Sequence, residues 1–134
     1  MGDRSNVFFQ QEPGVGIGVY FHWGGTGVAD AVSGLSDNRG FMNRLGDEQY
    51  ATRIGVQSVM DSLGIRASVE TGCGIWFSDQ GHDGEYRLVV VDVENGDVHV
   101  TASSESLETS AETLVGNLRT GVSPIEIKAA MERR

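Results

Sequence analysis

The residues best able to do chemistry are concentrated between positions 20 and 26, where the chain reads Tyr-Phe-His-Trp-Gly-Gly-Thr. A glycine pair that leads into a helix offers free backbone N–H groups and the positive end of the helix dipole, which together can hold an anion. An imidazole beside them can add a proton or a hydrogen bond. The segment has neither the lysine nor the spacing of a P-loop.

We therefore predict a binding site here, to which an arginine near the amino terminus adds a guanidinium that can grip an anionic ligand. The predicted site residues are Arg4, His22, Trp23, Gly24, Gly25 and Thr26. A structural alternative stays open, in which a strand ends in a packed tryptophan and in a turn that needs glycine.

Cys73, between two glycines, is the one cysteine of the chain. A thiolate nucleophile needs a base, and His22, His82 or His99 could be brought to it by folding. A cysteine in an apolar strand is more often a small buried hydrophobic residue, and we favour that interpretation.

Two further groups of polar residues are weaker candidates. The segment 79–85 holds three carboxylates and His82, but its spacing departs from that of a calcium loop, so we expect a solvated hairpin loop and no metal site. Asp92 and His99 are predicted to lie opposite each other on two strands, where they form either an acid-base pair or an ordinary cross-strand polar pair. No cofactor is predicted.

Composition and charge limit the classes of function. The chain has 134 residues, enough for one core, and a formal net charge of −9. Such a charge repels phosphate backbones and anionic lipid, so neither a nucleic acid nor a membrane is an expected partner. The apolar runs are far shorter than a bilayer span, and the start of the chain does not resemble a signal peptide. A single cysteine gives no internal disulfide, and we expect a cytoplasmic protein.

The first elements expected from the pattern are two strands, around residues 7–9 and 15–21, joined by a turn at Glu12, Pro13 and Gly14. Apolar residues alternate along the second strand, so one of its faces is apolar. The other face carries Gly16 and Gly18. A strand surface bare of side chains indicates that a backbone, an aromatic ring or a ligand lies against it.

Two helices are expected next, because apolar residues recur at helical spacing over 26–35 and over 47–63. Thr26 and Asp47 are the predicted caps, and Gly64 is the predicted left-handed stop of the second helix. Two apolar sides of this helix, one of them containing Tyr50, predict that it packs on both the sheet and a neighbour. The polar stretch 36–46 is expected to be a connection.

The remaining expected elements are a strand at 72–77, a hairpin of strands 86–93 and 98–102, and two helices from about 106 and 123. The pair Asn95-Gly96 predicts a type I′ turn, in which Val93 opposes Val98 and Asp92 opposes His99. The predicted fold is a single α+β domain over residues 1–134, with 104–134 as a helical C-terminal extension. Its order is β-β-α-α-β-β-β-α-α, with an antiparallel or mixed sheet of about five strands covered by helices.

Four segments together resemble a family of small proteins from tailed bacteriophages, actinobacteria and archaea: GDRSNVFF, YFHWGG, YATRIGVQSVM and TGCGIWFSD. The family shares a Gly-Asp-Arg start, a His-Trp-Gly-Gly turn and a Thr-Gly-x-Gly-Ile strand, matched here by 2–4, 22–25 and 71–75. Relatives commonly carry an aromatic residue at position 73, so Cys73 departs from the pattern and a thiol mechanism is disfavoured. The resemblance covers roughly residues 2–100 and implies a phage context without implying a mechanism.

The function these features favour is that of a non-enzymatic, phage-type accessory binding protein in the host cytoplasm. It would capture a small anionic ligand or a basic host protein, such as a defence component, because the acidic chain attracts basic partners. Two alternatives stay open. One is a small hydrolase or transferase that uses His22 or Cys73, and the other is a self-assembling subunit, a homo-oligomer whose exposed strand edges pair with copies of itself.

Overall fold

The computed structural model describes residues 4–12, 15–23, 25–77, 87–96 and 98–101. The first half contains strands β1 (Ser5–Glu12) and β2 (Val15–Phe21), helix α1 (Gly25–Ser33), the 3-10 helix η1 (Gly34–Asp37) and helices α2 (Arg39–Asn43) and α3 (Glu48–Ser62). Strands β3 (Cys73–Phe77), β4 (Arg87–Asp92) and β5 (Val98–Thr101) follow. The predicted loop at 79–85 and the predicted helical extension at 104–134 lie outside the described residues.

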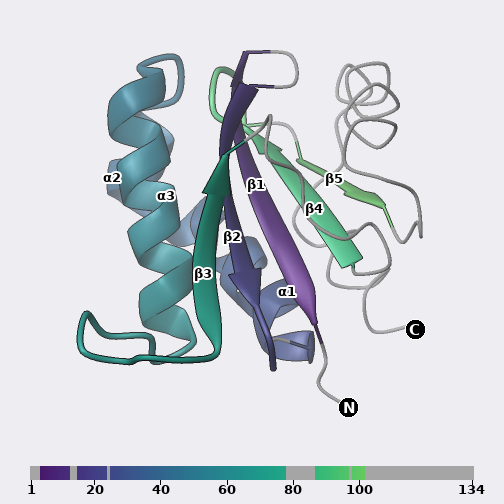
Figure 1. Cartoon of the computed structure of the whole chain (residues 1–134). Coiled ribbons are helices and arrows are strands. Elements are labelled where there is room, and N and C mark those ends of the chain that lie inside the picture. The colour runs from purple at the N-terminus through teal and green to yellow at the C-terminus, as the bar shows by residue number, and fades with distance from the viewer. Residues whose placement is uncertain (1–3, 13–14, 24, 78–86, 97, 102–134) are drawn as a thin grey trace.

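The strands form one mixed sheet in the order β3-β2-β1-β4-β5, with the helices beside it (Figure 1). β1 pairs with β4 in parallel, while the β1–β2, β2–β3 and β4–β5 pairs are antiparallel. The predicted α+β class is confirmed. No helix among the described residues has the length and apolar character needed to cross a membrane.

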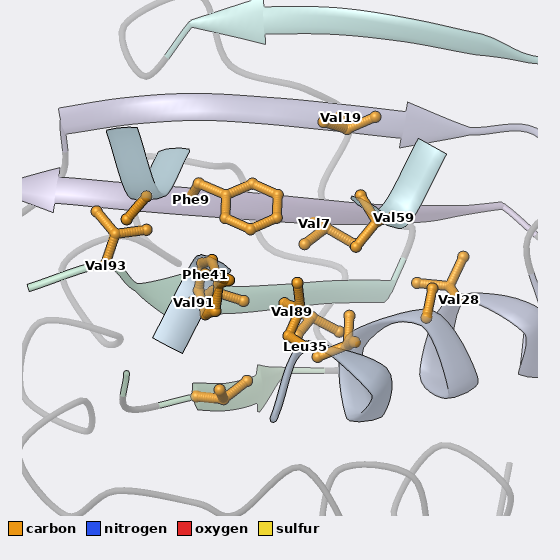
Figure 2. Packing of buried hydrophobic residues seen from close by; sticks show 14 of the residues in the cluster. Val7, Phe9, Val19, Val28, Leu35, Phe41, Val59, Val89, Val91 and Val93 are labelled. Atoms are coloured by element: carbon orange, nitrogen blue, oxygen red, sulfur yellow. The ribbon is translucent and has the colours of Figure 1, made fainter. Parts of the chain in front are cut away.

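The main core lies between one face of the sheet and the helices. In the register, Val7 stands beside Val19 on β2 and Val89 on β4, so the odd-numbered residues of these strands share a face. Figure 2 shows these valines with Phe9 and with residues of the helices. The buried members are Val7, Phe9, Val19, Phe21, Val28, Ala31, Val32, Leu35, Phe41, Ala51, Val59, Val89, Val91, Val93 and Val98.

Helix α3 packs on the sheet and on a neighbouring helix, as predicted. A Cβ on its buried Gly55 would lie 2.5 Å from Cε1 of Phe9 in the sheet and 3.0 Å from Cε1 of Phe41 on α2. Gly64 ends the helix with a φ of 74°, which confirms the predicted left-handed stop. Tyr50 does not belong to an apolar face, because it is 56% exposed.

The stretch 36–46 is not the simple connection that was predicted. It contains the end of η1 and all of α2, which begins after Asn38. The Asn38 side chain caps this helix by accepting a hydrogen bond from the backbone N–H of Phe41 at 3.0 Å. Burial of the Phe41 ring holds the short helix against the core. Asp47 stands at the N-cap of α3 as predicted, but its side chain makes no capping hydrogen bond.

The predicted type I′ turn and its register are wrong. Among the described residues only glycines have a positive φ, so Gly96, at 84°, meets the requirement of that turn while Asn95 does not. The hairpin pairs Val91 with Val98 and position 90 with position 99. The expected pair of Asp92 with His99 therefore does not form.

Other hydrogen bonds of Asp92 and Val93 explain why the loop between β4 and β5 is longer than the two residues predicted. An Asp92 side-chain oxygen accepts from the N–H of Glu94 at 2.9 Å, and the Asp92 carbonyl accepts from the N–H of Gly96 at 2.7 Å. Val93 is paired elsewhere, because its N–H donates to the Gln10 carbonyl and its carbonyl accepts from Gly46, both at 3.0 Å. A shift of two residues keeps each side chain on its face, so Val93 is buried as predicted.

The other face of the sheet has a smaller cluster, which consists of Phe8, Trp76, Val90 and the partly buried Tyr20. The bare surface predicted on β2 lies under it. A Cβ on Gly18 would overlap the indole ring of Trp76, and a Cβ on Gly16 would overlap the carbonyl of Phe9. The prediction that a ring or a backbone lies against these glycines is confirmed.

Candidate functional site

The predicted site lies where β2 ends at Phe21 and α1 begins at Gly25. His22 is half-buried there, and Trp23 is 68% exposed, more than any other large apolar side chain of the described residues. The two rings meet edge to face, with centroids 4.4 Å apart and planes at 82°. The imidazole thus supports one side of an indole that is largely exposed to solvent.

Tyr20, on β2 two residues before His22, holds the imidazole in place. Its hydroxyl and Nδ1 of His22 are 2.7 Å apart, within hydrogen-bond distance. This places the His22 side chain on the face of the sheet that carries Tyr20 and Trp76, away from the helices. A hydrogen bond at Nδ1 leaves Nε2 as the ring atom for a ligand.

The turn is also tied to the segment before β3. The backbone N–H of His22 donates to the carbonyl of Gly72 at 2.9 Å. Gly72 has a φ of 91°, and a Cβ there would lie 3.4 Å from Cζ3 of Trp23. The indole therefore rests against a glycine that a larger residue could replace only with backbone strain.

The other predicted site residues are placed less completely. Arg4 immediately precedes Ser5, which pairs with Phe21, so its position is next to that of His22 where β1 begins and β2 ends. Gly24 lies outside the described residues. Gly25 and Thr26 occupy the first turn of α1, so Thr26 is inside the helix and not at the predicted cap.

Cys73 and His22 do not form a thiol-imidazole pair. Cys73 stands opposite Phe21 in the sheet and packs against the core on the helix face. The His22 side chain lies on the opposite face, with Tyr20. Burial raises the pKa of the Cys73 thiol, which disfavours the nucleophilic thiolate at neutral pH.

Among the described residues, no group of three or more His, Cys, Asp or Glu side chains is arranged to hold a metal ion. His82 lies outside the described residues. His99 is placed only by its backbone in β5.

Two residues of the site were not predicted from the sequence. Tyr20 could have been found, because alternate residues of a strand share a face and Tyr20 is two residues from His22. Gly72 gave no local signal, since it reaches Trp23 only through the pairing of β2 with β3.

In comparisons with known proteins, the chain matches no family model, no curated protein and no solved structure.

Proposed function

We propose that this protein is a non-enzymatic binding module that recognises a partner protein through the β2–α1 turn, with Trp23 as the anchor. The observation that carries the proposal is the 68% exposure of this indole on a turn held by neighbouring groups. Tryptophan is enriched among the few interface residues that dominate binding energy. An anchor that is already oriented loses little conformational entropy on binding.

Three contacts support the orientation of the anchor. The His22 ring meets the indole edge to face, the Tyr20 hydroxyl lies 2.7 Å from Nδ1 of that imidazole, and the backbone of Gly72 lies beside the indole. The net charge of −9 favours a basic partner, because electrostatic attraction accelerates association with one. With the phage resemblance, these properties fit an accessory protein that blocks a basic host protein in the cytoplasm.

A small anionic ligand at the same turn is the second candidate. It is supported by the start of α1 directly after the turn and by the position of Arg4 next to that of His22. An enzyme that uses Cys73 is disfavoured, because the thiol and the imidazole lie on opposite faces of the sheet.

Native mass spectrometry of the full chain purified from phage-infected cells tests the proposal. We expect the wild-type protein to retain a second protein in fixed stoichiometry and the folded Trp23→Ala variant to lose it. Tyr50→Ala is the matched control, because Tyr50 is also an exposed aromatic residue but lies on α3. It should retain the partner.

Other results would contradict the proposal. Equal retention of the second protein by wild type and Trp23→Ala would remove Trp23 as the anchor. A retained small molecule that His22→Ala loses would favour the anionic ligand, and a homo-oligomer without a second protein would favour self-assembly.

A further inference from the structure

An open groove of about 680 Å³ lies between α3 and the strands β2 and β3. β3, the edge strand of the sheet, runs beside α3 in Figure 1. Ile17 of β2 and Ile75 of β3 line it from the sheet, and Val56 and Met60 line it from α3. Ile65, just after the helix, belongs to the same lining. Its volume falls within the range of about 300–1,000 Å³ that is usual for small-molecule sites.

The groove exists because α3 packs over β1 and not over the outer strand. Gly55 brings the helix close to the ring of Phe9 on β1. Ile75, two strands away, faces the helix side of the sheet but stays 54% exposed. An isoleucine in that position leaves apolar surface in water next to other apolar side chains, and burying such surface is favourable.

The charged lining of the groove is more basic than the protein as a whole. Arg53 and Arg66 line it, with Asp61 as the one acid, which gives a formal charge of 2 − 1 = +1 on a chain of −9. Arg53 donates to the neutral amide oxygen of Gln57 at 3.0 Å. In the part of the chain that the structure describes, neither arginine forms an ion pair with an acid.

We propose that this groove binds an amphiphilic carboxylate, with the carboxylate at Arg66, just beyond the end of α3, and the apolar chain along Met60, Val56 and Ile75. A monoanion complements the charge of the lining, and a guanidinium fork matches the two oxygens of a carboxylate. A second copy of the chain would bring an equally positive lining to this one. The proposal is independent of the function assigned to the β2–α1 turn.

Titration of the isotope-labelled full chain with sodium dodecanoate, below its micelle concentration, tests the proposal by NMR. We expect saturable binding of one molecule, with the largest shifts at Ile17, Val56, Met60 and Ile75. Dodecyltrimethylammonium has the same chain and the opposite charge, and it should bind roughly tenfold more weakly. Equal affinity of the two amphiphiles, or shifts scattered over other surfaces, would overturn the proposal.

Two substitutions probe the two parts of the groove. Ile75→Asp places a carboxylate beside the bound chain, and we expect dodecanoate affinity to fall by about tenfold. Arg66→Gln keeps a polar hydrogen-bonding side chain, removes its charge and should lower the affinity by about threefold. Arg39→Gln is the control, because Arg39 is exposed on α2 and does not line the groove; it should leave the affinity unchanged.

The remaining outcomes separate this site from its alternatives. If Arg66→Gln binds dodecanoate like the wild type, the carboxylate is not held there and the proposal fails. If the protein sediments as a dimer that Ile75→Asp dissociates, the groove is a contact between copies and the proposal also fails. Trp23→Ala should bind dodecanoate normally, so loss of the proposed function at the turn and loss of this site are distinguishable.

Discussion

The two tryptophans stand in opposite environments, Trp76 within β3 and Trp23 in the turn that follows β2. Trp76 is 4% exposed, stacks on Phe8 with ring centroids 5.3 Å apart, and donates from Nε1 to the side-chain oxygen of Asn6 at 3.0 Å. Trp23 is 68% exposed. Trp76 lies against Gly18 and Trp23 against Gly72. The polar atom of Trp76 has an acceptor inside the sheet, the side chain of Asn6. A buried, hydrogen-bonded indole contributes to stability, whereas an exposed and oriented one is available for recognition.

The largest expected effect is on the buried ring. Trp76→Ala removes the stack with Phe8 and leaves a cavity over Gly18, so we expect the free energy of unfolding to fall by about 3–5 kcal/mol. Chemical denaturation monitored by circular dichroism measures it. A loss below about 1 kcal/mol would show that the cluster on this face does not stabilise the sheet.

A smaller loss is expected from Gly18→Ala, which places a methyl group where the Trp76 ring lies. Overpacking of this kind costs about 1–3 kcal/mol. Gly74→Ala is the matched control on the adjacent strand, because a Cβ there meets no atom within 4 Å. Equal stabilities of the two variants would contradict the close contact between Gly18 and the indole.

The hydrogen bond to the indole is tested by Asn6→Ala. Asn6 is buried, and its loss removes the acceptor that Trp76 Nε1 uses inside the protein. Leaving a buried donor without that acceptor costs about 1–3 kcal/mol, and we expect a value toward the lower end in denaturant titrations. In the Trp76→Phe background, Asn6→Ala should cost less, because no indole N–H is present; equal costs in both backgrounds would contradict the coupling.

The sequence predicts the fold better than it predicts the site. Alternation along 15–21 identifies the apolar face and the bare glycine surface because side chains of a strand alternate strictly. The hairpin register fails because Val93 finds partners on Gln10 and Gly46, and such long-range hydrogen bonds leave no local pattern. For the same reason Gly72 could not be assigned to the site, while Tyr20 could have been inferred from its spacing to His22.

The reactivity of Cys73 tests whether its thiol, at the start of β3, is packed against the core. Burial raises its pKa, so the folded state favours the neutral thiol. The raised pKa contributes stability to the folded state at neutral pH. This contribution is lost as the pH rises from the unfolded-state pKa of the thiol through its higher folded-state pKa. At pH 8 we expect iodoacetamide to alkylate the native thiol more slowly than the thiol of the unfolded chain. A native rate equal to or above the unfolded rate would contradict the packed assignment.

The most direct test of the separation between the two tryptophans is made on the Trp23→Ala variant. Its free energy of unfolding should match that of the wild type within about 0.5 kcal/mol, the usual range for surface substitutions. The native mass spectrum of the same preparation should lack the second protein that the wild type retains. A destabilised variant, or a stable one that keeps its partner, would contradict the account.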